Sequence, residues 1–178
     1  MLIPDQAAPA LNVPTVAHGA FDLASARPER MTLVNFYRGL HCPICAKYLA
    51  ELEEQAPAFA ERGVDVIAVS TDPMDRAQGM VDKISAKHLK IGYDLPLNVA
   101  KEWGLYLSQS KGATSIGIEE SPIFAEPGLF LVRNDNRVFY ASVQSMPFAR
   151  PKYAELVGAL DFVIANDYPA RGTYTGAV

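Results

Sequence analysis

The pattern of apolar and polar positions along the chain predicts alternating strands and helices. Apolar, β-branched and aromatic residues fill positions 31–37 and 64–70, which predicts two buried strands. Between them, apolar residues at helical spacing predict a helix over about 43–55, which we expect Pro57 to break or restart before Gly63 ends the element. A strand–helix–strand unit of this kind predicts a parallel strand pair joined by a right-handed crossover.

The rest of the chain predicts further elements of similar size. We expect helices over about 73–88, 97–103 and 152–166, and a β-hairpin with strands 129–133 and 138–142. Residues 108–126 predict a long irregular loop, and loops of this length in compact domains are often functional. Residues 1–30 predict an N-terminal extension of short strands and turns, and residues 167–178 a polar tail. Together these elements predict one domain over residues 1–178.

The composition is that of an ordinary soluble globular protein, with 49% apolar and 20% charged residues. The formal charge of −4 argues against a nucleic-acid partner, because phosphate binding needs clustered Lys and Arg. No apolar run approaches the ~20 residues of a membrane-spanning helix. Residues 1–6 lack the charged and apolar regions of a signal peptide. We therefore expect a cytoplasmic protein without a membrane partner.

The two cysteines of the chain, Cys42 and Cys45, lie three positions apart where the first buried strand leads into a helix. Pro43 suits the first helical position, which makes Cys42 the N-cap residue. The helix dipole and a backbone N–H of residue 44 or 45 would stabilise a Cys42 thiolate and lower its pKa. Helical residues three apart have Cβ atoms about 5–6 Å from each other, so the pair can close a disulfide with modest adjustment. The spacing therefore predicts a redox-active dithiol.

Two other interpretations of the cysteine pair remain open. A zinc site would need two more ligands, but His18, His41 and His88 form no pair with zinc-ligand spacing, so we expect no metal. A structural pair of packed thiols would make the chain a redox-inert binding or scaffold module. In a cytoplasmic protein, a lone pair of cysteines at this spacing is more often catalytic than a structural staple.

Segment 36–45, FYRGLHCPIC, is followed in order by segment 66–71, by Asp94 with segment 99–104, and by segment 127–132. Over about residues 8–161 this order resembles the peroxiredoxin-like family of alkyl hydroperoxide reductases and thiol-specific antioxidants, within the thioredoxin-fold superfamily. The resemblance implies an α/β thioredoxin-like fold, with a central mixed sheet flanked by helices. It also implies an antioxidant-type thiol oxidoreductase that needs no cofactor.

The candidate site departs from the family pattern Pro-x-x-x-Thr-x-x-Cys. The motif is not reproduced with either Cys42 or Cys45 at the peroxidatic position. An arginine that polarises the peroxide in this family is replaced by Pro127, which instead resembles the cis-proline of thioredoxins or is an ordinary strand-edge proline. Arg38 or Arg150 could supply the missing charge, although the sequence places neither of them near the cysteines.

We predict a thiol oxidoreductase, either a disulfide reductase or a thiol peroxidase. Cys42 would attack a disulfide or a hydroperoxide, Cys45 would resolve the product to an intramolecular disulfide, and a thioredoxin- or glutaredoxin-like reductant would restore the dithiol. Thiol–disulfide exchange is slightly favoured, because no peroxide-activating arginine is evident. His41 either lowers the Cys42 pKa further as an imidazolium, or is exposed and has little influence. The tail segment 168–172 could serve the contact of a homodimer.

Overall fold

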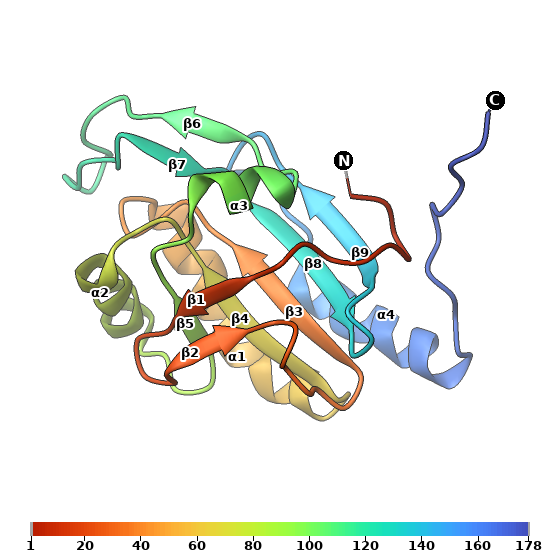
Figure 1. Cartoon of the computed structure of the whole chain (residues 1–178). Helices are drawn as coiled ribbons and strands as arrows, with labels where there is room; N and C mark the ends of the chain where they lie inside the picture. The colour runs from red at the N-terminus through yellow and green to blue at the C-terminus, as the bar shows by residue number, and fades with distance from the viewer. Residues whose placement is uncertain (1, 178) are drawn as a thin grey trace.

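The computed structural model describes residues 2–177, and its centre is a five-stranded mixed sheet in the order β5-β4-β3-β8-β9 (Figure 1). The middle strand β3 (Met31–Phe36) runs parallel to β4 (Val64–Val69) and antiparallel to β8 (Gly128–Arg133). Strands β5 (Lys90–Gly92) and β9 (Val138–Val143) form the two edges. The predicted parallel pair, the β8–β9 hairpin and the central mixed sheet are confirmed.

Both faces of the sheet are covered, which explains why its strands are apolar runs rather than alternating sequences. Met31 and Leu33 of β3 pack into a core with α1, α2 and α4, whereas Val34 and Phe36 pack into a second core with α3 and the β1–β2 hairpin. The helices are α1 (Pro43–Ala60), α2 (Met74–Ile84), α3 (Leu97–Glu102) and α4 (Tyr153–Ala165), and the hairpin strands are β1 (Asn12–Pro14) and β2 (Ala20–Asp22).

Helix α1 is longer than predicted, because it continues through Pro57 to Ala60. A proline inside a helix removes one backbone hydrogen bond. Here Ala56 directly before the proline and Phe59 two positions after it are buried against the core, and their burial offsets that loss. The expected break or restart at Pro57 is therefore wrong.

The sequence pattern predicts helix to residue 88, but α2 ends at Ile84 and the chain turns away there. Ser85 adopts a left-handed backbone conformation with φ 52°. The Glu53 carboxylate of α1 then accepts hydrogen bonds from the backbone N–H groups of Lys87, His88 and Leu89, at 2.8–2.9 Å. These bonds hold the segment extended and lead it into the edge strand β5, which the sequence pattern did not reveal.

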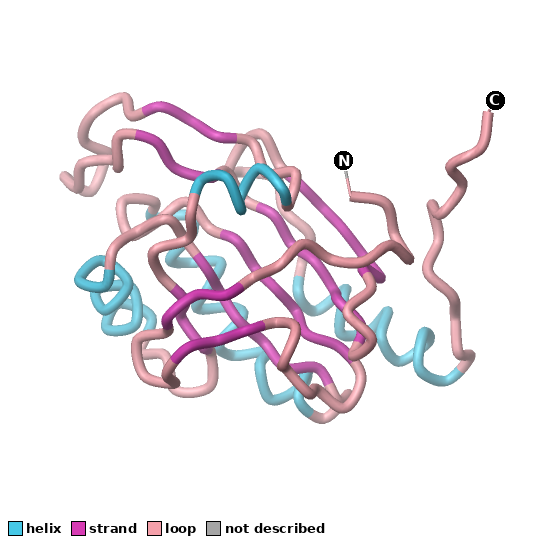
Figure 2. Tube along the Cα trace, viewed as in Figure 1, coloured by secondary structure: helices cyan, strands magenta, loops and turns pink. Residues whose placement is uncertain are grey.

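The predicted irregular loop is in part a small hairpin, in which β6 (Leu107–Gln109) pairs with β7 (Ile123–Ala125) and residues 110–122 form the connection. Residues 166–177 carry no helix or strand (Figure 2). Met1 and Val178, the ends of the predicted extension and tail, lie outside the described residues. No helix in residues 2–177 combines the length and the apolar character needed to cross a membrane.

Candidate active site

The dithiol lies at the N-terminus of α1, where β3 ends and the helix begins. Cys42 is the N-cap with extended backbone angles, Pro43 occupies the first helical turn, and the Cys42 Sγ accepts a hydrogen bond from the Cys45 backbone N–H at 3.2 Å. The predicted cap is therefore present, and both cysteines are free thiols.

The turn before Cys42 is held by a buried carboxylate. The Asp72 Oδ2 accepts a hydrogen bond from the Leu40 backbone N–H at 2.7 Å. Gly39 has φ +136°, and a Cβ added there would lie 2.6 Å from the same oxygen. Only glycine fits this approach without strain, so Asp72 and Gly39 together fix the path of the chain into the helix.

The two thiols differ in acidity because their surroundings differ. The Cys42 pKa is lowered to about 6 by a hydrogen bond from the Cys45 side chain, by the Cys45 backbone N–H, and by the charges of Arg38 and Arg150, against an opposing effect of burial. Burial and the neighbouring Cys42 raise the pKa of the Cys45 thiol. At neutral pH the site therefore holds a thiolate at Cys42 and a protonated thiol at Cys45.

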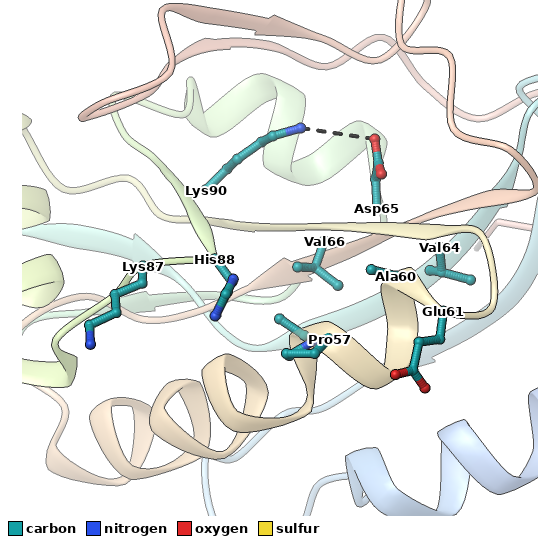
Figure 3. Close-up of a pocket in the computed structure, with 10 residues that line it drawn as sticks. Pro57, Ala60, Glu61, Val64, Asp65, Val66, Lys87, His88 and Lys90 are labelled. Carbon is teal, nitrogen blue, oxygen red and sulfur yellow. Dashed lines mark ion pairs between the residues drawn. The ribbon is translucent and has the colours of Figure 1, made fainter.

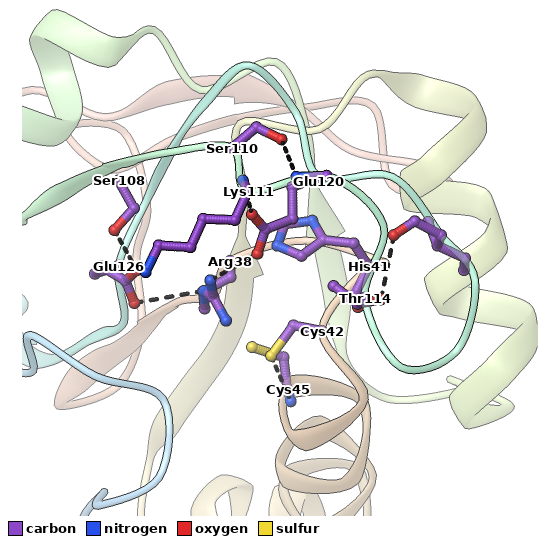
Figure 4. A network of polar contacts seen from close by, with 12 residues as sticks. Arg38, His41, Cys42, Cys45, Ser108, Ser110, Lys111, Thr114, Glu120 and Glu126 are labelled. Atoms are coloured by element: carbon purple, nitrogen blue, oxygen red, sulfur yellow. Dashed lines mark hydrogen bonds and ion pairs between the residues drawn. The ribbon is translucent and has the colours of Figure 1, made fainter.

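The connection between β6 and β7 covers the dithiol (Figure 4). Thr114 Oγ1 donates a hydrogen bond to the backbone carbonyl of His41 at 2.7 Å, and Ser121 Oγ lies 3.4 Å from Asp72 Oδ1. Beneath this cover the Cys42 residue is 1% exposed and Cys45 is fully buried. The predicted long loop therefore lies against the segment that carries the dithiol, and its functional role stays a prediction.

Arg38 lies near Cys42 but is shared with the covering loop. Its Nη2 is 3.0 Å from Glu120 Oε1, its Nε is 3.5 Å from Glu126 Oε2, and its guanidinium carbon lies 4.7 Å from the centre of the Phe124 ring. Glu120 follows Glu119 in the chain, and adjacent acidic residues of this kind are typical of solvated surfaces. The structure instead pairs it with Arg38 across 82 positions of sequence, a distance that no local pattern reveals.

Arg150 lies on the other side of the dithiol, in the segment that joins β9 to α4. Its Nη2 is 3.0 Å from the Cys45 Sγ, its Nε donates to the Pro147 carbonyl at 2.9 Å, and its guanidinium carbon lies 4.9 Å from the centre of the Tyr48 ring. The structure thus brings both candidate arginines to the cysteine pair, which the sequence could not do.

His41 matches neither alternative that the sequence left open. Its side chain is fully buried, its ring centre lies 4.8 Å from that of Phe124, and neither ring nitrogen has a hydrogen-bond partner among the described residues. Burial, together with the positive charge of Arg38, lowers the His41 pKa to about 4. The imidazole is therefore neutral at physiological pH and cannot stabilise the thiolate as a cation.

Pro127 is not a cis-proline, because every peptide bond in residues 2–177 is trans. Its carbonyl accepts a hydrogen bond from the Gln144 N–H at 2.9 Å, which extends the β8–β9 pairing, and the preceding Glu126 N–H bonds to the Tyr106 carbonyl. Pro127 is therefore an ordinary residue directly before β8, at the edge of the strand as the second interpretation held, and the cis-proline interpretation is wrong.

A cavity that none of the predicted site residues lines is remote from the dithiol. Its volume is about 550 Å³, and it lies between the C-terminal half of α1 and strands β4 and β5, with Pro57, Val66 and His88 among its lining residues (Figure 3). None of the residues around the cysteines lines it. Within residues 2–177 no group of three or more His, Cys, Asp or Glu side chains is placed to hold a metal ion.

Comparison with known proteins adds a family and a fold. Residues 4–141 match the model of a family described as the AhpC/TSA family. The chain is similar to peroxidoxin BcpB from Mycobacterium tuberculosis (17% identity, TM-score 0.69, covering 93% of this chain and 99% of that one). It is also similar to AhpC from Enterococcus faecalis (15%, 0.72, 94% and 98%) and to the mitochondrial 2-Cys peroxiredoxin from Plasmodium falciparum (15%, 0.72, 93% and 96%). A search of curated protein sequences gives no significant match. The structural similarities support the fold that the sequence predicted.

Proposed function

Because the chain belongs to the AhpC/TSA family and is a thiol-dependent oxidoreductase, we propose that it reduces a small hydroperoxide, with Cys42 as the nucleophile and Cys45 as the resolving thiol. The observation that carries this choice of acceptor is the burial of an ionised Cys42 beneath the covering loop, with 1% of the residue exposed. A hydroperoxide of a few atoms can enter such a site. A protein disulfide has to place one of its sulfurs in line with the Cys42 Sγ, and the covering loop obstructs that approach.

The charges around Cys42 suit attack on a peroxide. The Cys42 thiolate attacks one peroxide oxygen, the O–O bond breaks, and the leaving oxygen takes up a proton to form water or an alcohol. Negative charge spreads over the two oxygens during this step, and fixed positive groups stabilise it. Arg38 and Arg150 both act on the Cys42 sulfur electrostatically, which removes the reason for favouring disulfide exchange.

The cycle closes through Cys45. Its thiol attacks the Cys42 sulfenic acid, water leaves, and the intramolecular disulfide forms. A dithiol reductant of the thioredoxin or glutaredoxin type then restores both thiols, and the cytoplasm is the compartment where we expect such a reductant.

The test is a comparison of oxidants on the reduced protein in rapid-mixing experiments, with the products identified by mass spectrometry. We expect hydrogen peroxide to oxidise the protein at least 100-fold faster than oxidised glutathione. The Cys45→Ser variant should form one sulfenic acid at Cys42, trapped by dimedone, and Cys42→Ser should form none. Faster, Cys42-dependent reaction with glutathione disulfide would instead identify a disulfide reductase, and slow reaction with both would identify a redox-inert module.

A second variant tests the role of the covering loop. Thr114→Val removes the hydrogen bond from the loop to the His41 carbonyl and leaves the groups around the two sulfurs in place. If the loop excludes disulfides, this variant should react faster with glutathione disulfide and at an unchanged rate with hydrogen peroxide. Equal effects on both oxidants would show that the loop does not select between them.

A further inference from the structure

Arg150 contacts the resolving sulfur rather than the nucleophilic one. Three interactions fix its guanidinium: the contact with the Cys45 Sγ at 3.0 Å, the hydrogen bond to the Pro147 carbonyl, and the stacking over Tyr48. Arg150 is therefore held beside Cys45 before any oxidation takes place, and its side chain does not have to change conformation to bring the positive charge to the sulfur.

The guanidinium of Arg150 has no carboxylate partner in residues 2–177, and its Nη1 has no hydrogen-bond partner there. This contrasts with Arg38, which is paired with Glu120 and Glu126. Arginine does not deprotonate in proteins, and a buried charge without a partner is costly. The acidic groups that can balance Arg150 are therefore the two thiols.

The site holds one thiolate in the reduced protein, at Cys42, and oxidation of Cys42 to the sulfenic acid removes that charge. The effects that raise the pKa of Cys45 are burial first, and then the hydrogen bond and the charge of Cys42, whereas Arg150 lowers it. The charge and the accepted hydrogen bond of Cys42 disappear on oxidation, and the contact with Arg150 stays.

Two other titratable groups act on Cys45, namely Tyr37 after β3 and Tyr153 of α4. Burial raises the pKa of both phenols far above neutrality, so both are uncharged. The electrostatic change at Cys45 during the reaction therefore comes from Cys42 and Arg150.

We propose that Arg150 is a catalytic residue of the second step, in which it stabilises the Cys45 thiolate once Cys42 has been oxidised. The proposal rests on the two-cysteine cycle of the proposed function. In this step Cys45 loses its proton, its sulfur forms a bond to the Cys42 sulfur, and the S–O bond of the sulfenic acid breaks. The hydroxide that leaves takes up one proton and departs as water. One negative charge thus passes from Cys42 to Cys45, and Arg150 serves as its counter-ion in the second position.

The experiment measures the two steps separately in the wild type, in Arg150→Met and in Arg150→Lys. Hydrogen peroxide is the first oxidant, and mass spectrometry of quenched samples follows the sulfenic acid and then the disulfide. 4,4′-Dithiodipyridine is the second oxidant: Cys42 attacks it and releases one thiopyridone, and Cys45 then attacks the Cys42 sulfur and releases another. Arg171→Met, which changes an exposed arginine of the tail, is the matched control, and circular dichroism checks that each variant is folded.

We expect Arg150→Met to slow the second step at pH 7 at least tenfold more than it slows the first step, with either oxidant, because the arginine contacts the Cys45 sulfur directly and acts on Cys42 only through its charge. The deficit should shrink as the pH rises, because hydroxide then ionises Cys45 without the arginine, and Arg150→Lys should recover part of the rate. An unchanged second step, or equal slowing of both steps at every pH, would overturn the role of Arg150. If hydrogen peroxide forms no sulfenic acid while the dithiodipyridine steps behave as expected, the hydroperoxide function fails and the role of Arg150 stands.

Discussion

Replacing Cys45 tests the origin of the acidity of Cys42, because the Cys45 side chain supplies the largest effect that lowers the Cys42 pKa to about 6. Cys45→Ala removes this hydrogen bond, whereas Cys45→Ser keeps a donor at the same position. The backbone N–H of residue 45 and the nearby arginines remain in both variants. The pair of variants therefore isolates one side-chain hydrogen bond.

The expected magnitude follows from the strength of a hydrogen bond to a charged group, about 1.5–3 kcal/mol, which corresponds to roughly a tenfold to hundredfold change in an acid dissociation constant. With a pKa of about 6, Cys42 is about nine-tenths ionised at pH 7. In Cys45→Ala the ionised fraction at pH 7 should fall to between about one-half and one-tenth.

The assay is the rate of alkylation of Cys42 by iodoacetamide between pH 4.5 and 9.5, since only the thiolate reacts. We expect the midpoint of the rate profile to move up by about one to two pH units in Cys45→Ala, and to stay near that of the dithiol in Cys45→Ser. A midpoint near pH 6 in both variants would refute the reasoning, and would assign the acidity to the helix terminus and the arginines alone.

Three further changes test the surroundings of the dithiol. The pKa of His41 is about 4 in the folded protein and near 6.5 in the unfolded chain, so the unfolded chain binds a proton first as the pH falls. Between these two values the histidine lowers the free energy of unfolding by up to about 3 kcal/mol. His41→Phe should lack this loss of stability at acid pH, as measured by urea unfolding. Gly39→Ala should destabilise the protein by about 2 kcal/mol or more and slow its oxidation by peroxide, because the new Cβ collides with the Asp72 carboxylate. Thermal unfolding measures the stability and rapid mixing the rate, and wild-type values of both would contradict this. Arg38→Met removes the ion-pair partner of the Glu120 and Glu126 carboxylates, whose side chains are 9% and 6% exposed. The unfolding free energy should fall by about 3–5 kcal/mol, and a change below about 1 kcal/mol would show that the ion pairs are not structural.

The elements that the sequence predicted well are those governed by nearby residues. Cys42 caps α1 because Pro43 starts the helix and the Cys45 backbone N–H reaches the Cys42 sulfur, and this depends on the four positions 42–45 alone. The two parallel strands were visible because a strand buried on both faces is a continuous apolar run. The general chemistry of the site, a thiolate at the N-cap and a second thiol one turn later, follows from the same local rules.

The elements that the sequence did not predict depend on distant partners. Arg150 meets Cys45 across 105 positions, and Arg38 meets Glu120 across 82. The polarity of His41 suggested a charged or exposed ring, but its burial is decided by the covering loop and by Phe124. Tertiary contacts of this kind leave no periodic signal in the chain, so the sequence could name the arginines without placing them.

The position of Cys45 one helical turn from Cys42 also bears on how the protein survives excess oxidant. A sulfenic acid that waits for its partner thiol can react with a second hydroperoxide and become a sulfinic acid, which thiols do not reduce. Here the partner is already in the same turn of helix, so no helix has to unwind and no second copy of the chain has to donate a thiol. Hyperoxidation then competes with an intramolecular reaction of high effective molarity, and catalysis should persist at hydroperoxide concentrations that would inactivate a site with a distant resolving thiol.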